Sequence, residues 1–598
     1  MNRQLLLAAS AGAAVFAGAG VGVTQTAPGS AAAFVSPVTL AQSVCGRSAN
    51  VMRERRAFFL QAATAWAETG AVGAEKKGVS SEPVTRAGIA YKITTSSPAA
   101  QGYFDEGLAH MWNFNHGAAI AAFKKAQDAD PNCAMCHWGE ALAYGPNINA
   151  PMDDASTAPA AAATRAARAR AASASDTEKS LIAALEARYE RPLAMMERHK
   201  LDEAFADRMD AIAKSHPNDD FIAALAAEAM MDTQPWDYWE LDGRTPKGRT
   251  GRAIELIEQV LDRNPDHIAA IHLYIHLTEA TADPFRAVQF ADNLDDLAPG
   301  LGHLIHMPSH TYYRIGRFKD SMDVNVRAAL ADEAFIAEGS ASPFYEFGYY
   351  VHNVHFLMAA ALMAGDGETA IAMAKKLDAK LPVEMALAVP FAQPIKAAPY
   401  YAMATFAAPE DVLSMPEPDA SAPFLVGIWR YARGEALAKA GRAREAATEA
   451  DRIAAIADDN AFKALIEVGI PAMDILRIAE LTVRARAAAA DDDLDTAIAA
   501  MELAVDVQAR VNYTEPPYWY YPARQTLAAL ILRKGDAARA EQMFMATLVE
   551  APNSGWAYFG LAEALRAQGD KPGRKYAEQL HQSAWLGGKK DRLTLSKL

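Results

Sequence analysis

Apolar and small residues recur along most of the chain in a pattern that predicts antiparallel pairs of packed helices. In the segment 103–131, Gly107 and Ala119 allow two helices to cross closely. The same segment carries aromatic Phe123, and Pro131 ends its second helix. Related patterns occur at 354–382, 431–450, 524–552 and 556–585. The sequence therefore predicts an all-α protein built from successive helix pairs.

Histidines are concentrated in one stretch, because seven of the fourteen in the chain lie between residues 271 and 356. Within three sets they are three or four residues apart, which places each set on one face of a helix. Glu279 follows the first set by three residues. The seven are His272, His276, His303, His306, His310, His352 and His355.

The sets of histidines are in register with one another. The step along the chain from His272 to His306 equals the step from His276 to His310, and the third set follows after the same step plus an insertion. The step matches the period of the tetratricopeptide repeat, about 34 residues. We therefore expect the imidazoles to lie on the same helix of three successive repeats, on the concave face. Neighbouring helix axes lie about 8–10 Å apart, so these side chains should converge.

The convergence of imidazoles predicts a metal site, because neutral imidazole is the commonest metal ligand in proteins. Seven imidazoles and Glu279 exceed the needs of one four-coordinate ion, which favours two ions, or one ion with supporting histidines. Glu279 is a candidate ligand, bridge or general base. The ligand types suit zinc, copper or iron, which the sequence does not distinguish. A metalloprotease motif is excluded, since Leu273 occupies the position of its glutamate.

Three further residues are candidates for catalysis or anion binding. Tyr313 follows Glu279 by the same repeat step and should share its face, and with Tyr312 and Arg314 it offers hydrogen-bond donors. Two aromatic segments, 235–239 and 513–521, are expected near the concave groove. The alternative to a metal site is a histidine-lined groove that binds an acidic or aromatic ligand without metal.

Charge and hydropathy limit the class of protein. The net charge of −15 argues against a nucleic-acid partner, and no apolar run of transmembrane length follows the N-terminus. Residues 1–41 resemble a secretory signal peptide: Arg3 precedes an apolar run, and small residues follow it. This predicts a periplasmic or secreted protein without a membrane span after cleavage, and the alternative is an N-terminal membrane anchor.

The remaining chain divides into an extension and one long repeat array. Residues 42–98 contain partly helical pieces without a clear repeat. Residues 99–598 are expected to form an α-solenoid with inserted segments near 145–175, 234–250 and 389–422. The first insertion is alanine-rich and helical in its latter half, and the last is proline-rich and irregular.

A short motif, Cys133-Ala-Met-Cys136-His137, matches the attachment site of a c-type haem. In that case two thioethers would hold the haem and His137 would be its axial ligand. The motif also lies at a turn between predicted repeats, where spacing of three permits a Cys133–Cys136 disulfide. A third alternative is that the cysteines do neither.

From residue 103 onward the chain resembles a group of exported bacterial tetratricopeptide-repeat proteins of largely unknown function. The resemblance is carried by 133–141, 145–151, 235–239, 264–267, 272–276, 303–310, 352–355 and 515–522. It implies a right-handed superhelix of helix pairs and no settled activity. In this group a tyrosine often replaces His137, which argues against haem attachment.

These observations give three functional hypotheses. The first is an exported metalloprotein, and an enzyme if the metal keeps open positions that activate water or dioxygen. The second is an interaction scaffold whose concave groove binds a peptide or protein without metal. The third is a c-type haem protein.

Overall fold

The computed structural model describes residues 89–189, 198–240, 242–456 and 461–598. Within these ranges the chain is helical, and the only β-structure is two isolated bridges, which confirms the predicted all-α class. None of the described helices has both the length and the apolar character needed to cross a bilayer. The predicted signal peptide, 1–41, and residues 42–88 of the predicted extension lie outside the described ranges.

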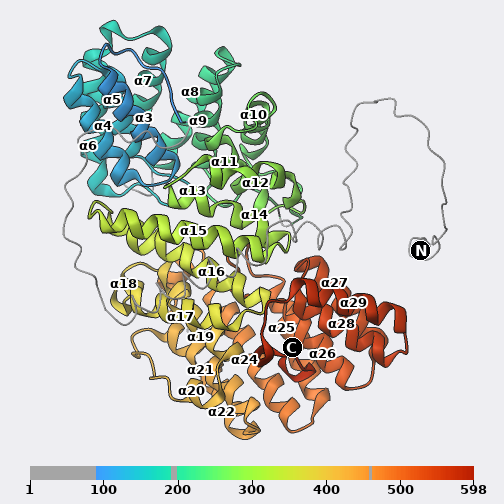
Figure 1. The fold of residues 1–598 in the computed structure, drawn as a ribbon. Coiled ribbons are helices and arrows are strands. Elements are labelled where there is room, and N and C mark those ends of the chain that lie inside the picture. Colours follow the sequence, from blue (N-terminus) through green and yellow to red (C-terminus); the bar gives the residue numbers. More distant parts are fainter. Residues whose placement is uncertain (1–88, 190–197, 241, 457–460) are drawn as a thin grey trace, which may run out of the picture.

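The helices follow one another in pairs from one end of the molecule to the other (Figure 1). The N-terminal helices are α3 Pro98–Trp112, α4 His116–Ala129, α5 Ala134–Ala143, α6 Asp154–Arg170, α7 Asp176–Tyr189, α8 His199–Ser215, α9 Asp220–Met231, α10 Thr250–Arg263 and α11 Ile268–Glu279. The middle helices are α12 Val288–Leu297, α13 Gly302–His306, α14 Pro308–Arg314, α15 Phe318–Ala337, the π-helical turn η5 Tyr345–Tyr349, α16 Tyr350–Ala364 and α17 Gly367–Lys380.

The C-terminal half continues the array. Its helices are α18 Val383–Ala388, α19 Ala392–Phe406, α20 Pro409–Leu413, α21 Pro423–Lys439, α22 Ala443–Ile456, α23 Lys463–Glu467, α24 Ala472–Ala490, α25 Leu494–Gln508, α26 Ala523–Arg533, α27 Ala537–Glu550, α28 Gly555–Ala567 and α29 Lys571–Ala584. In Figure 1, α15 crosses the middle of the molecule between the blue-green N-terminal helices and the yellow-to-red C-terminal ones.

Three of the turns between paired helices are Gly-Asp dipeptides, at 365–366, 535–536 and 569–570. Each glycine has a φ between 75° and 97°, a left-handed conformation that ends the first helix. Each aspartate caps the second helix, because its carboxylate accepts a hydrogen bond from a backbone N–H of the first turn. The sequence thus specifies both ends of the turn.

Packing within the repeats follows the predicted pattern of small and aromatic residues. Phe123 of α4 lies between Gly107 of α3 and Gly139 of α5, and a Cβ on either glycine would be 2.5 Å from its ring. Gly560 has the same relation to Phe544, at 2.2 Å. The close crossing therefore requires glycine, and the tetratricopeptide-type helix pair is present at both ends of the array.

One predicted insertion differs from the structure. The sequence predicts an irregular segment at 389–422, yet α19 and α20 occupy most of this range. Pro394 lies in the first turn of α19, where a backbone N–H has no partner within the helix. Pro399 lies inside α19 and is buried. The prolines are tolerated because α19 packs between α17 and α21, and tertiary burial outweighs the local cost.

The array turns back on itself near its middle. Asn553, before α28, donates from Nδ2 to the carbonyl of Gly316 at 2.9 Å. Trp556 of α28 donates from Nε1 to the carbonyl of Leu362 at 3.1 Å. The C-terminal helices therefore contact α16 and the turn after α14, and they help to enclose the histidine-rich helices.

Candidate metal centre

Four helices carry the histidines predicted to form the site. His272 and His276 lie on α11, and His352 and His355 lie on α16. His303 and His306 lie on α13 and His310 on α14, because the helix predicted to carry all three is interrupted at Met307. Pro308 begins α14, and since proline lacks an N–H it cannot bond to the carbonyl of Leu304.

Six of the seven histidines form two triads. The ligand atoms of the first triad lie within 4.8 Å of one another, and the same holds for the second. The first triad is His272, His276 and His303. The second triad is His306, His310 and His352. The convergence predicted from the repeat register is thus present, with His303 turned toward α11 and His306 toward α16.

The triads are buried and do not line an open concave surface, which corrects the prediction. Five of the six imidazoles are at most 2% exposed; only His352 is partly exposed. One phenylalanine packs on each triad. The Phe114 ring centre is 4.5 Å from that of His272 and 5.1 Å from that of His303. Phe356 lies at 5.0 Å from His306 and 4.9 Å from His310.

Phe114 was not predicted, because it belongs to the first repeat and lies far from the histidines in the sequence. Its φ of 53° places it in the left-handed turn between α3 and α4. The turn approaches α13, since the backbone N–H of Leu304 donates to the side chain of Asn113 at 3.1 Å. An unusual φ at a bulky residue is a structural signal that the sequence alone does not reveal.

Glu279 joins the two triads. Its Oε1 accepts a hydrogen bond from Nδ1 of His276 and its Oε2 accepts one from Nδ1 of His310, both at 2.7 Å. The hydroxyl of Tyr513 also donates to Oε2, at 3.1 Å. Although burial alone would raise it, the neighbouring His310 and His276 lower the pKa of Glu279 to about 2, so the group is a carboxylate.

These hydrogen bonds fix the tautomers of the imidazoles. A carboxylate only accepts, so Nδ1 of His276 and of His310 each carries a proton, and in the neutral imidazole Nε2 is then the lone-pair acceptor. In His306, Nδ1 donates to Oδ1 of Asn325 at 2.6 Å. The amide of Asn325 is oriented by its own Nδ2, which donates to the carbonyl of Ser321 at 2.7 Å. Nε2 of His306 is therefore also a lone-pair acceptor.

In the second triad, Nε2 of His306 and Nε2 of His310 are 2.8 Å apart. In the first triad, Nε2 of His272 and Nε2 of His303 are 3.2 Å apart, and Nε2 of His276 is buried without a hydrogen-bond partner. Burial, reinforced by neighbouring imidazoles, lowers the pKa of four triad histidines well below its ordinary value: His272, His303, His306 and His352. Protonation of these four imidazoles is therefore unfavourable.

Three predicted site residues lie apart from the triads. His355 is on the same helix as His352, but its Nε2 pairs with the hydroxyl of Tyr520 at 2.6 Å. Tyr313 donates to the carbonyl of Tyr520 at 3.3 Å, and Arg314 donates to the carbonyl of Thr281 at 3.1 Å. The structure does not bring these three side chains into the triads.

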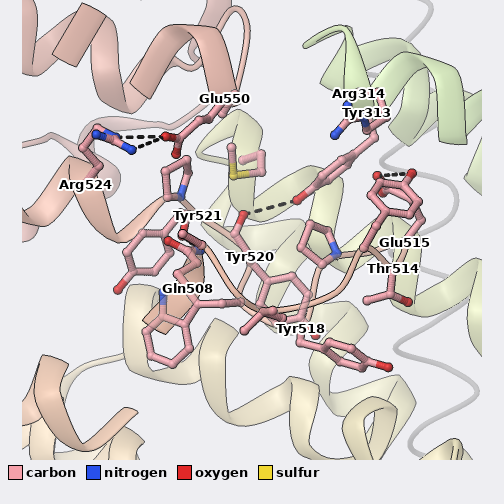
Figure 2. Close-up of a pocket in the computed structure, with 18 of the residues that line it drawn as sticks. Tyr313, Arg314, Gln508, Thr514, Glu515, Tyr518, Tyr520, Tyr521, Arg524 and Glu550 are labelled. Atoms are coloured by element: carbon pink, nitrogen blue, oxygen red, sulfur yellow. Dashed lines mark hydrogen bonds and ion pairs between the residues drawn. The ribbon is translucent and has the colours of Figure 1, made fainter. Parts of the chain in front are cut away.

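Tyr313 and Arg314 instead line a cavity of about 320 Å³ (Figure 2). Figure 2 shows the segment 513–521 along this cavity, with the Tyr513–Glu515 and Tyr313–Tyr520 hydrogen bonds and the Arg524–Glu550 ion pair. Tyr312, grouped with them in the sequence, points elsewhere: its hydroxyl donates to Asp292 at 2.9 Å.

Both aromatic segments contact histidines of this region or Glu279. The ring of Trp236 lies 5.3 Å from that of His276. Tyr513 reaches Glu279, and Tyr520 reaches His355. These contacts help to cover imidazoles that lie on repeat helices.

The cysteine motif forms a disulfide between Cys133 and Cys136. Both sulfurs are used, so the motif does not offer the two thioethers that a c-type haem requires. Cys133 is also the N-cap of α5. Burial lowers the pKa of His137, which follows the disulfide on the same helix.

No family model matches the sequence, and no curated protein sequence matches it. Comparison with solved structures finds several similar proteins. The structure of yeast Tom70 aligns with 80% of this chain and 92% of its own, with 11% sequence identity and a TM-score of 0.26. The tetratricopeptide-repeat domain of P58(IPK) is 12% identical with a TM-score of 0.20, over 79% and 99%. The human IFIT1 dimer with m7Gppp-AAAA is 11% identical with a TM-score of 0.31, over 80% and 94%. At such TM-scores the assignment of the fold rests on the helix pairs described above.

Proposed function

We propose that this chain is a metalloprotein in which each histidine triad binds one transition-metal ion. One observation carries the proposal: Nε2 of His306 and Nε2 of His310, both acceptors when the imidazoles are neutral, lie 2.8 Å apart in a buried site. Facing acceptors repel, and a cation between them turns the repulsion into coordination. Two nitrogens bound to one ion at about 2.0–2.1 Å lie roughly 2.9–3.4 Å apart, close to the spacing found here.

Glu279 supports the same assignment. A metal-bound imidazole usually donates its other ring N–H to a carboxylate or carbonyl, which fixes the tautomer and strengthens the ligand. Glu279 does this for one histidine of each triad, and Asn325 does it for His306. Glu279 therefore acts as an orienting carboxylate between two sites, and both of its oxygens are used for that purpose.

The ligand set favours zinc or copper over iron. Each triad contains imidazole alone, whereas mononuclear iron oxygenase sites combine two histidines with a carboxylate. Three protein ligands leave a position for water or substrate on a four-coordinate ion. His352 is the partly exposed member of the triads, so the second triad is better placed to react with a molecule from solvent.

The first test is elemental analysis of dialysed protein purified from its native host. We expect two ions per chain in the wild type, one in His276→Ala, one in His310→Ala and none in the double variant. His355→Ala is the matched control, because His355, on α16, is buried like the other two histidines but lies outside both triads. It should retain both ions.

Folding of each variant is checked by circular dichroism. Absence of metal from folded wild-type protein would contradict the proposal. Retention of metal by the folded double variant would also contradict it, since the ions would then lie elsewhere.

A second candidate function is protein binding, because solenoids of helix pairs present extended surfaces to partners. It is supported by α27, which exposes Met545 and Val549, one turn apart, at 50% and 81%. Cross-linking in the native host tests this candidate: a partner captured by wild-type protein should be lost in Met545→Asp/Val549→Asp and retained in His310→Ala.

We also propose that the protein is exported. The Cys133–Cys136 disulfide supports this, because disulfides persist in oxidising compartments. Cell fractionation with N-terminal sequencing tests it, and mature protein in the cytoplasm with residues 1–41 intact would contradict it.

A further inference from the structure

A second cavity, of about 160 Å³, lies against the second triad. We name it the triad cavity. His352 lines it, together with His355 from the same helix. The segment 514–520 separates it from the larger cavity of Figure 2, since residues of this segment line both. A molecule in the triad cavity therefore lies beside a proposed metal ligand.

The walls of the triad cavity are mostly apolar. They come from α19, α21, α24 and the segment 514–520: Pro394, Ile395, Phe424, Ile475, Pro516 and Tyr518. Phe391 also lines the cavity and exposes 55% of its surface, which places one wall at the molecular surface. Apolar walls with few polar groups are typical of sites for small organic molecules.

Three buried polar atoms among the lining residues have no hydrogen-bond partner. They are Nδ1 of His355, the hydroxyl of Tyr401 and Oε2 of Glu515. Each of these residues is at most 6% exposed. A buried polar atom without a partner is unfavourable, so three on residues that line one small cavity indicate a ligand with a polar group of its own.

The size of the cavity limits the apolar part of that ligand. A cavity of about 150 Å³ with apolar walls accommodates one benzene molecule. The triad cavity is of this size and adds a hydroxyl, an imidazole nitrogen and a carboxyl group. Because burial raises the pKa of Glu515 to about 8, this carboxyl is protonated at neutral pH and does not select a cation.

We propose that the triad cavity binds a phenol with a single aromatic ring. The ring lies among the apolar walls, and the hydroxyl pairs with the unpartnered atoms of Tyr401, His355 and Glu515. A hydroxyl suits this set because it both donates and accepts. The role of this phenol as a substrate rests on the proposed metal at the second triad, while its binding rests on the cavity alone.

The experiment is fluorine NMR of 4-fluorophenol and fluorobenzene titrated with metal-stripped protein. We expect saturable binding of 4-fluorophenol, with fluorobenzene bound about tenfold more weakly, since one good hydrogen bond is worth about that factor. Tyr401→Phe keeps the volume and deletes the hydroxyl, so it should remove most of this preference. Tyr431→Phe is the control, because Tyr431 packs on Tyr401 at 5.3 Å but does not line the triad cavity.

A second arm adds Co²⁺, a paramagnetic ion. The signal of bound 4-fluorophenol should broaden in wild-type protein and stay sharp in His306→Ala, which removes a ligand of the second triad. If binding depends on Tyr401 but the signal does not broaden with Co²⁺, the phenol site is supported and a metal at the second triad is contradicted. The phenol site would be overturned, whatever the metal content, if no saturable binding were found. It would also be overturned if wild type and Tyr401→Phe each bound both compounds with equal affinity.

Discussion

At the scale of single residues, Glu279 has the largest consequences for the candidate site. A glutamine at this position would keep one oxygen to accept from one imidazole. Its amide group would face the Nδ1–H of the other imidazole, so one donor would meet another. That imidazole would have to move its proton to Nε2, where it blocks a metal.

Glu279→Gln is therefore expected to weaken metal binding about 10- to 100-fold at the triad whose imidazole faces the amide group. Competition with a chelator of known affinity measures this change. Glu258→Gln is the control, because Glu258 of α10 accepts a hydrogen bond from Tyr274, which lies on α11 with Glu279 but outside the triads. Unchanged metal affinity at both triads would mean that Glu279 does not orient the metal-binding imidazoles.

Glu515 gives a prediction about pH. Burial raises its pKa to about 8 in the folded protein, against an ordinary value of 4.5. The folded state therefore holds this proton more tightly than the unfolded state. The stabilisation of the folded state is complete below pH 4.5 and is lost as the pH rises through 8.

Glu515→Gln removes this dependence. Relative to wild type, the variant should gain stability between pH 5 and pH 9, by roughly 3 kcal/mol, given about 1.36 kcal/mol for each unit of pKa shift and allowance for partial relaxation. Urea unfolding at the two pH values measures the difference. A constant difference would mean that Glu515 is ionised in the folded protein at neutral pH.

Residue spacing predicted much of the site. The three- and four-residue steps of the histidines survive in the structure because they lie on helices, where periodicity fixes the face. His355 has the same spacing from His352 as His306 has from His303, yet it binds Tyr520 and no triad. Spacing specifies a face but not the neighbour across it, and neighbours such as Phe114, Asn325 and Tyr513 come from distant repeats or from loops.

At the scale of helices, the crossing of α3, α4 and α5 depends on two glycines. Gly139→Ala would place a methyl group 2.5 Å from the ring of Phe123. We expect a loss of about 1–3 kcal/mol in the free energy of unfolding, because a packed ring cannot yield without shifting a helix.

Thermal unfolding measures this loss, and Phe123→Leu in the same chain should recover part of it. Gly348→Ala is the control, since a Cβ there meets nothing within 4 Å. Additive effects of Gly139→Ala and Phe123→Leu would contradict the steric explanation.

Helices were predictable where small residues, prolines and turn dipeptides agreed. Prediction failed at 389–422, where prolines suggest an irregular segment and α19 forms. It also failed at Met307, because the histidine spacing places this residue in the middle of one helix, whereas Pro308 begins another. At both places packing decides whether a helix continues through a proline or ends before it. A single sequence does not show that packing.

At the scale of the whole molecule, the return of the C-terminal helices should protect the site. Asn553→Gly removes the hydrogen bond to Gly316 but accommodates the φ of 55° at this position. We expect a loss of about 1 kcal/mol in stability and faster hydrogen exchange in α13 and α14.

Hydrogen exchange followed by mass spectrometry checks this prediction. Asn512→Gly is the control, because Asn512 is exposed and its hydrogen bond to Gly469 is long, at 3.4 Å. Equal exchange in both variants would indicate that the contact at Gly316 does not hold the two halves together.

The linking carboxylate also has a consequence for charge balance. Imidazole binds a metal as a neutral ligand, so among these residues only Glu279 would contribute a negative charge, shared by both triads. Two divalent ions would leave a large positive excess in a site where water cannot screen it. The metal-loaded protein should therefore attract small anions to the partly exposed second triad. The simplest such anion would be hydroxide, which a metal-bound water would supply by losing a proton.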